Sequence, residues 1–449
     1  MTFSSLLPRI GLVAFAFCVI SLSGCTDSIT GPDVNDAVET ELTETASKFR
    51  HANLFDRALR TGTNQVAGKK PNELGLIIKI SPYALMERYK LMERYALMER
   101  YKLMERYEYT EAFSGFAVTI EDTTGGSDFT DIISALSAEP GIEWFEPDYT
   151  VVNPTAAEIG GQVGQSVPWN VAYVGGKESS TVSGDGSGSV PVDVYIIDTG
   201  VSNDDLNIVE SVDFRGVVGM DANDYDGHGT HVAGIIGAMD NTEGLVGVAP
   251  GARIHNLKVM GDDGTSDVSV VIAAVEHVIA ARRANPTTPM VVNMSLGENI
   301  GTTQFTALDE SVDLLVSLGV TVVVAAGNQG VNADLVTPAH VPNVITVGAH
   351  DSDGYFTSFS NSGGSVDILA PGANVISLQA TQGGVGTPVQ MTGTSMAAPH
   401  VAGAAALYLY ANPTASPADV RAALLAAARG GILLTGAQTV AKSVYVGGM

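Results

Sequence analysis

The sequence predicts an α/β fold: a doubly wound, mostly parallel sheet with helices on both faces, preceded by a small α+β domain. Past Pro191, short runs rich in Val and Ile alternate with longer segments of helical length and composition. Such continuous apolar runs are typical of strands that are buried on both faces. Strand–helix–strand alternation implies right-handed crossovers and a parallel sheet covered by helices. We therefore expect a ligand site at the carboxyl ends of the strands.

Length and composition suit a globular protein with more than one domain. The chain has 449 residues, of which 45% are hydrophobic and 16% charged. Its formal net charge of −26 argues against nucleic acid as a partner. The acidity indicates either a highly soluble surface, as in a salty habitat, or calcium sites.

Residues 1–25 have the pattern of an export signal. Arg9 precedes an apolar run, 10–22, that is too short to span a bilayer but typical of a signal-peptide core. The run ends in Leu-Ser-Gly-Cys, which resembles the bacterial lipobox, where cleavage leaves a lipid-modified cysteine at the new N-terminus. An ordinary secretory signal is the alternative. We expect an exported precursor that is lipid-anchored in a bacterial cell envelope through Cys25.

An acidic tether is expected over 26–70, after the signal. Both cysteines of the chain, Cys18 and Cys25, lie within the signal. The exported protein then has no internal disulfide, so another kind of interaction must stabilise its fold.

Residues 71–153 read as the small α+β domain. Three segments are expected to be strands: LGLIIKI at 74–80, FSGFAVTI at 113–120 and IEWFEPDYTVV at 142–152. A helix is expected over DFTDIISALSAEPG at 128–141.

A hexamer repeat lies inside this small domain. Residues 84–107 read ALMERYKLMERYALMERYKLMERY, four copies that differ only in the first letter. All its residue types but Tyr favour helix, so we expect one helix roughly 36 Å long. Six residues turn about 600°, so successive apolar clusters fall about 120° apart and cannot share one packed face. The repeat is therefore interpreted as a tolerated expansion of one helix, with an interaction helix as the alternative.

The larger domain continues the alternation to the C-terminus. Its expected strands are VDVYIIDTG, RIHNLKVM, MVVNMSLG, TVVVAAGN, VITVGAH, VDILAPG and NVISLQA. Its expected helices are HGTHVAGIIGAM, VSVVIAAVEHVIAARRA and FTALDESVDLLVSLG, followed by two Ala-rich helices over 394–412 and 417–428.

Four residues at the ends of these elements suggest nucleophilic catalysis. Asp198 and Asn328 end expected strands, and His228 and Ser395 begin expected helices. A serine hydroxyl becomes a strong nucleophile when an imidazole takes its proton and a buried carboxylate orients that imidazole. Amide groups at a helix N-terminus and an Asn side chain can stabilise the oxyanion that forms. The order Asp, His, Ser is one of three described for this triad.

The motifs around these residues resemble the subtilisin-like serine peptidases over 165–449. Five motifs match in the family's order: VYIIDTGV, DGHGTHVAGIIG, VVNMSLG, AAGNQG and GTSMAAPHVAG. The resemblance implies a secreted serine endopeptidase with Asp198, His228 and Ser395 as its triad and Asn328 as an oxyanion donor. Two alternatives remain: a catalytically silent binding protein of the same shape, and an esterase. The motif GTSMA differs from the G-x-S-x-G of α/β-hydrolases.

The resemblance also implies a substrate cleft and an inhibitory propeptide. Two edge segments would receive an extended peptide, and small residues would open the pocket for the side chain before the cleaved bond. The cleft residues are then Gly264, Ser266, Ser295, Leu296, Gly297, Ala326 and Gly327. The domain at 71–153 resembles the family's propeptide, which assists folding, covers the cleft and is cut off, here between about Val152 and Gln165. The partners expected are protein substrates and this propeptide, with the mature enzyme a monomer.

Calcium is the one cofactor that the resemblance implies, with no organic cofactor. The loop MDNTEGL at 239–245 resembles the family's calcium loop, and all-oxygen coordination suits Ca²⁺ rather than zinc. An acidic surface turn is the alternative. The expected ligands are Gln165, Asp205, Met239, Asn241, Glu243 and Leu245, with Asp204 as a replacement for Asp205. Asp367 is a candidate ligand for a second site.

Overall fold

The computed structural model describes residues 48–51, 74–80, 98, 101, 103–120, 126–139, 141–152, 156–158, 165–216, 221–434 and 438–449. The predicted export signal, nearly all of the acidic tether and most of the hexamer repeat lie outside these residues. The chain divides into two compact units, Met1–Glu41 and Leu42–Met449, and all described residues belong to the second. Within the described part of the chain, no helix is long and apolar enough to cross a membrane.

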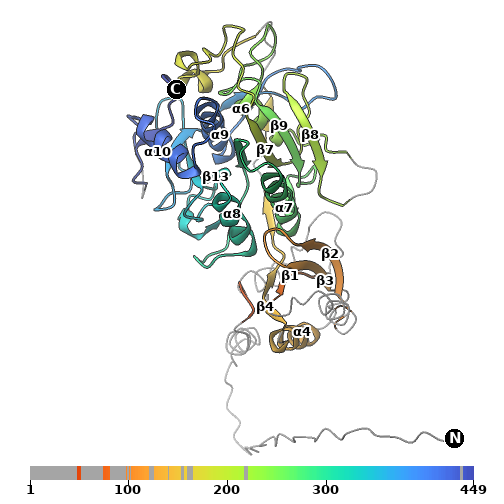
Figure 1. The fold of residues 1–449 in the computed structure, drawn as a ribbon. Coiled ribbons are helices and arrows are strands. Elements are labelled where there is room, and N and C mark those ends of the chain that lie inside the picture. The colour runs from red at the N-terminus through yellow and green to blue at the C-terminus, as the bar shows by residue number, and fades with distance from the viewer. Residues whose placement is uncertain are drawn as a thin grey trace, which may run out of the picture. The chain divides into compact units, whose positions relative to one another are not determined.

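A nine-stranded sheet forms the centre of the larger domain (Figure 1). In order across the sheet, its strands are β19 (Arg429–Gly430), β20 (Lys442–Ser443), β16 (Ile368–Pro371), β15 (Ile345–His350), β13 (Thr321–Ala325), β11 (Met290–Met294), β7 (Asp193–Asp198), β9 (Arg253–Lys258) and β8 (Ile208–Asp213). Every neighbouring pair is parallel except β19 and β20. The chain adds strands on both sides of β7, so the strand order reverses there. An α/β sheet places its site at such a reversal.

Helices pack on both faces of this sheet, as the sequence predicts (Figure 1). They are α5 (Trp169–Tyr173), α6 (His228–Gly237), α7 (Val268–Ala284), α8 (Ala307–Ser317), α9 (Thr394–Ala411) and α10 (Pro417–Ala427). Alternate residues of a strand face opposite sides, and β7 feeds two cores accordingly. Its Val194 and Ile196 pack in one cluster with α6 and α9, whereas Tyr195 and Ile197 pack in another with α7 and α8. The predicted fold class is confirmed.

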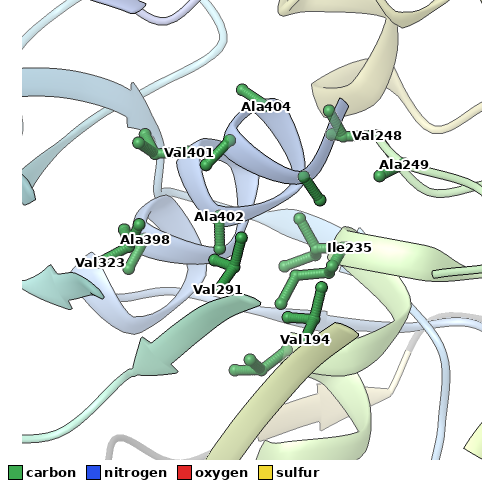
Figure 2. Packing of buried hydrophobic residues seen from close by; sticks show 14 of the residues in the cluster. Val194, Ile235, Val248, Ala249, Val291, Val323, Ala398, Val401, Ala402 and Ala404 are labelled. Atoms are coloured by element: carbon green, nitrogen blue, oxygen red, sulfur yellow. The ribbon is translucent and has the colours of Figure 1, made fainter. Parts of the chain in front are cut away.

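Small side chains let α9 lie deep against the sheet (Figure 2). Ala398, Val401 and Ala402 of this helix pack with Val291 and Val323 from neighbouring strands. A helix that is apolar on nearly all sides is stable only when it is surrounded by protein. The helix that begins at the predicted nucleophile is therefore anchored in the centre of the core.

A four-stranded antiparallel sheet and the helix α4 make up most of the described part of the small domain. Across the sheet its strands are β2 (Leu103–Tyr109), β3 (Gly115–Ile120), β1 (Leu74–Ile80) and β4 (Ile142–Pro147), and its helix is α4 (Gly126–Ala138). Leu76, Ile78, Phe116, Leu136 and Phe145 share its core. The predicted small α+β domain is confirmed, with strands near 74–80 and 113–120 as expected. The single strand expected over 142–152 is instead two strands, because only 142–147 joins this sheet and 150–152 pairs elsewhere.

The hexamer repeat is not one helix throughout, which corrects the prediction. Its last five residues, 103–107, belong to β2 and pair with β3. Met98 and Tyr101 are helical, and the other residues of the first three copies lie outside the described residues. Burial of Leu103, together with the pairing to β3, outweighs the helix propensity of the LMERY sequence.

Several short elements lie outside the two sheets. The antiparallel pairs are β5 (Thr150–Val152) with β10 (Thr265–Asp267), β12 (Glu298–Asn299) with β14 (Val336–Thr337), and β18 (Val389–Met391) with both β17 (Val375–Ser377) and β6 (Ala156–Glu158). Two 3₁₀ turns cover Gly176–Glu178 and Ala333–Leu335.

Candidate active site

Asp198 and His228 meet at the end of β7. Asp198 is the last residue of this strand and His228 the first of α6. His228 Nδ1 donates to Asp198 Oδ1 over 2.7 Å, and both side chains are buried. Burial lowers the pKa of His228, but the charge and hydrogen bond of Asp198, together with the charges of Asp226 and Asp224, outweigh burial and raise this pKa above 6.5. The carboxylate therefore fixes the tautomer of the ring and stabilises its protonated form.

Glycine at position 229 makes this approach possible. A Cβ there would collide with the carbonyl oxygen of Gly200, just after β7, and would touch Asp198. Gly229 is thus a packing requirement for the helix that carries His228.

A second buried carboxylate, Asp224, holds this arrangement and was not singled out from the sequence. It accepts hydrogen bonds from Thr199 Oγ1 (2.9 Å), Gly227 N (2.8 Å), and Thr230 N (2.8 Å) and Oγ1 (2.6 Å). It therefore joins the residue after Asp198 to the first turn of α6. An Asp shortly before a helix start is an N-terminal signal that could have indicated this role.

Ser395, the second residue of α9, lies beside Ser295. Its Oγ donates to the backbone oxygen of Ser295 over 3.1 Å, and Ser295 Oγ donates to the backbone oxygen of Ser395 over 2.8 Å. His228 Nε2 is buried without a hydrogen-bond partner among the described residues. The hydroxyl must therefore rotate away from Ser295 to give its proton to the imidazole. Catalytic hydrogen bonds often tighten only when substrate binds.

Asn328 is held so that its amide nitrogen remains a donor. Its Oδ1 accepts from Thr394 N (2.7 Å) and Thr394 Oγ1 (2.9 Å), which fixes the orientation of the amide. Asn361, which the sequence did not single out, shapes the same loop: its Nδ2 donates to Ala326 O, and its Oδ1 accepts from Gln329 N and Val331 N. An amide in the middle of a loop gave no local signal for this role.

One predicted edge of the cleft is already paired with an extended segment. Ser266 lies in β10, which is antiparallel to β5 and opposite Val151. Gly264 has a φ of +70° in the turn before β10, a conformation that glycine adopts without strain. The pairing is a β-augmentation in which the C-terminal end of the small domain is the added strand.

The other predicted cleft residues lie close to Ser395 or in the segments that pack around it. Ser295 contacts Ser395 directly, whereas Leu296 and Ala326 are buried in hydrophobic clusters. A Cβ on Gly297 would lie 2.8 Å from Thr337 O, so glycine is needed beside β14. Gly327 has a φ of +99° and donates its N–H to Thr394 Oγ1 over 3.0 Å.

Most of the predicted calcium ligands come together near the end of α6. Asn241 Nδ2 donates to Asp205 Oδ1 over 2.6 Å, and Leu245 N donates to Asp205 Oδ2 over 3.2 Å. Gln165 Nε2 donates to Met239 O over 2.8 Å. The Glu243 backbone N–H donates to Asn241 Oδ1 over 2.7 Å.

This cluster fits a hard cation rather than zinc. Its oxygens come from one carboxylate, two side-chain amides and backbone carbonyls, and burial raises the pKa of Asp205 to about 6. No group of three or more His, Cys, Asp or Glu side chains in the described ranges could hold a metal. Asp204 lies apart from the cluster, because its carboxylate accepts from Gly384 N. Asp205 is therefore the better candidate of the two.

Asp367 is engaged by protein groups instead. Its carboxylate forms an ion pair with Arg421 and accepts from Thr346 N over 3.0 Å. Because a guanidinium already neutralises this carboxylate, Asp367 is a poor candidate for a second calcium ligand.

Comparison with known proteins gives a consistent result. A family model described as the subtilase family matches residues 191–444, more than half of the chain. Subtilisin E of Bacillus subtilis (strain 168) is 38% identical over 297 residues, which cover 64% of this chain and 71% of that protein. The extracellular serine proteinase of Thermus sp. (strain Rt41A) is 36% identical over 331 residues, 71% of each chain.

A solved structure agrees with these relatives. The crystal structure of a cold adapted subtilisin-like serine proteinase matches with a TM-score of 0.53 at 34% identity, and the match covers 62% of this chain and 97% of that one. The chain therefore belongs to the subtilase family and is a subtilisin-like serine endopeptidase.

Proposed function

We propose that this endopeptidase cuts proteins with Ser395 as nucleophile, His228 as general base and Asp198 as the residue that orients the base. The observation that carries the proposal is the buried Asp198–His228 hydrogen bond, which leaves Nε2 of the ring to take a proton. Ser395 Oγ attacks the peptide carbonyl as its proton passes to His228, which later gives that proton to the departing amine. Asn328 Nδ2 and the Ser395 N–H stabilise the oxyanion.

Two other functions fit the residues less well. A catalytically silent binding protein would have no use for a buried Asp–His pair in a chain that also places a serine at the start of a buried helix. An esterase of the α/β-hydrolase type would place its nucleophile in G-x-S-x-G, whereas Ser395 lies in GTSMA.

The direct test uses purified precursor, casein and a serine-directed inhibitor. Casein should be hydrolysed after self-processing, and the inhibitor should abolish hydrolysis while labelling the peptide that contains Ser395. Label on a different residue, or hydrolysis that resists the inhibitor, would contradict the assignment of the nucleophile.

Asn328→Ala should lower kcat by about 10²–10³-fold with little change in KM, a range carried over from subtilisin itself. The reason is that the amide stabilises charge that exists only in the transition state. Steady-state kinetics on a peptide substrate measure both constants. Asn343→Ala is a suitable control, because Asn343 is exposed and its amide, among the described residues, donates only to half-buried Asp313. An equal loss in both variants, or a change confined to KM, would refute this role.

The small domain serves as the inhibitory propeptide in this proposal. Its support is the position of its last strand and of the segment that follows: β5 pairs with β10 at the predicted cleft, and β6 pairs with β18, which leads into α9 and Ser395. The chain is thus held on both sides of three residues, 153–155. We infer that self-processing cuts a bond between Val152 and Ala156, within the interval that the sequence predicts.

The propeptide domain also contacts α7 and α8. The Glu276 carboxylate accepts from the N–H groups of Thr110 (3.0 Å) and Glu111 (2.8 Å) and from that of Ala112. Glu146 Oε1 accepts from Ala307 N at the start of α8 over 3.0 Å. These bonds cross from one domain to the other, so they would hold an uncut or newly cut propeptide over the cleft.

Calcium binding at the Asp205 cluster is proposed as the structural cofactor site. Asp205, Asn241 and Gln165 would supply side-chain oxygens, and carbonyls of Met239, Glu243 and Leu245 would complete the set. When bound, the ion would neutralise a buried carboxylate and brace a chain that has no cysteine beyond residue 25.

The precursor is proposed to be anchored by lipid on Cys25 and the mature enzyme to be released. Several acyl chains on one cysteine would hold the precursor in the membrane. The inferred cut follows the propeptide, so it separates the enzyme from its anchor. The enzyme would then be periplasmic or extracellular, because its acidic surface is repelled by anionic lipid.

Fractionation tests this release. Mature enzyme should be found in the soluble fraction, whereas a Ser395→Ala precursor should stay with the membrane. A Cys25→Ala precursor serves as the unanchored control. Mature enzyme in the membrane pellet after a salt wash would overturn the model.

A further inference from the structure

The last copy of the hexamer repeat contacts the peptidase domain. Arg106 Nη1 donates to Asp148 Oδ2 over 3.0 Å and to Asp267 Oδ2 over 2.6 Å. Asp148 belongs to the propeptide domain and Asp267 to β10, at the edge of the cleft and at the N-terminus of α7. Their side chains are 0% and 1% exposed. One guanidinium thus neutralises two buried carboxylates from the two domains.

Two tyrosines extend this contact along β2. Tyr107 OH donates to the backbone oxygen of Phe214 over 2.9 Å, and buried Tyr109 OH donates to that of Ser269 over 3.0 Å. Ser269 also donates from its N and Oγ to Asp148. The strand therefore contacts the cleft edge, the first turn of α7 and the segment after β8.

We propose that this fourth copy helps to lock the propeptide onto the peptidase, beside the contacts of Glu276 and Glu146, and that the copies before it are dispensable for the lock. The proposal rests on the inhibitory role assigned to the small domain. It makes Arg106 and Tyr107 interface residues, although the same residue pair occurs in each of the other copies.

The sequence after the repeat selects the fourth copy. If β2 slipped back by one copy, Leu103 would take the position of Tyr109. The slip would lose the hydroxyl bond to Ser269 and the contact between the Tyr109 and Phe113 rings, whose centroids are 5.1 Å apart. The carboxylate pair that binds Arg106 accommodates one guanidinium, so arginines of other copies cannot occupy it simultaneously.

The connection between β1 and β2 limits how many copies can be removed. Both strands pair antiparallel with β3, which lies between them, so they are parallel to each other. A crossover between parallel strands needs about a dozen residues or more. Removal of the second copy, residues 90–95, shortens the connection by one hexamer and leaves enough residues for the crossover between β1 and β2. It also keeps Tyr101, whose hydroxyl donates to Glu139.

Hydrogen exchange on the full-length Ser395→Ala chain tests the lock without relying on activity. Arg106→Met should speed exchange of the amides at 265–272 by at least about tenfold, because buried carboxylates lose their cation. Arg94→Met is the matched control, because Arg94 has the same position in the second copy. It should leave exchange unchanged, as should deletion of 90–95. Arg106→Lys should give an intermediate exchange rate, because an ammonium keeps the positive charge but lacks the planar set of N–H donors of a guanidinium.

Exchange at β11 shows whether each variant is folded and should stay slow in all of them. If Arg106→Met leaves exchange at 265–272 unchanged, or if Arg94→Met speeds it equally, the proposal is wrong. In chains with Ser395 intact, Arg106→Met should also shorten the lag before casein hydrolysis. A wild-type chain without any lag would refute the inhibitory role of the small domain. The exchange measurements would still show whether Arg106 stabilises the contact between the two domains.

Discussion

Ser395→Ala should abolish both casein hydrolysis and self-processing, leaving a precursor of full length after signal removal. The expected loss in kcat is about 10⁶-fold, a value carried over from subtilisin, a member of this family. The physical reason is that the methyl group of alanine can neither attack a carbonyl nor exchange a proton with His228. Intact mass of the purified chain, before and after incubation, measures processing, and casein hydrolysis measures activity.

Ser317→Ala is the matched control, because Ser317 is exposed and its hydroxyl donates only to Leu314 O, within α8. It should process and hydrolyse casein as the wild type does. Adding a trace of active enzyme to the Ser395→Ala precursor separates loss of chemistry from misfolding, since a folded precursor should be cut at few sites, whereas a misfolded one should be degraded throughout. Spontaneous processing of the purified Ser395→Ala chain would refute the assignment of Ser395.

The wild-type chain should gain a new N-terminus after the first cut, at residue 153, 154, 155 or 156. N-terminal sequencing at the earliest time point checks this, before any later trimming. A first cut beyond Glu158 would contradict the inference drawn from the β5–β10 and β6–β18 pairings.

The contact between Asp198 and His228 could be predicted, because each proposed catalytic residue lies in a local pattern that one sheet topology brings together. Asp198 ends a run of apolar residues, and His228 and Ser395 begin segments of helical composition. In a parallel sheet these ends meet at one edge, so position in sequence is enough to predict their proximity.

The support around these residues could not be predicted in the same way. The bonds of Asp224 reach both Thr199 and Thr230, and those of Asn361 reach a loop more than 30 residues before it. The Asp367–Arg421 ion pair likewise joins separate parts of the chain, which sequence spacing does not reveal.

The prediction that the hexamer repeat forms one helix was wrong for a different physical reason. Its composition favours helix, and that preference is intrinsic and weak compared with burial. Leu103 gains a place in the core of the small domain only as part of a strand beside β3. A period of six does not place all the apolar clusters of a long helix on one face. This mismatch is consistent with at least one copy forming a strand instead of a helix.

Chelation of calcium should lower the melting temperature of the full-length Ser395→Ala chain clearly at neutral pH. A ligand that binds only the folded state adds about 2.7 kcal/mol to the free energy of unfolding at 100 times its Kd. No disulfide can compensate, because both cysteines precede residue 26. Thermal melts with calcium and with chelator measure the difference.

Asn241→Ala should shrink this difference, because the variant loses one side-chain oxygen and the partner that orients Asp205. Asn343→Ala, on the surface beside Asp313, should leave it unchanged. Equal melting temperatures with calcium and with chelator in the wild type would refute the calcium site.

The difference in melting temperature between the calcium and chelator samples should also increase with pH. Burial raises the pKa of Asp205 from 3.8 to about 6 in the folded chain without metal. The folded state then binds the proton more tightly than the unfolded state, so protonation stabilises this form fully below pH 3.8, and the benefit is lost as pH rises through about 6. Calcium needs the ionised carboxylate, so its stabilising effect should be small at pH 5 and large at pH 8. A difference that is larger at pH 5 than at pH 8 would exclude Asp205 as the carboxylate that binds the ion.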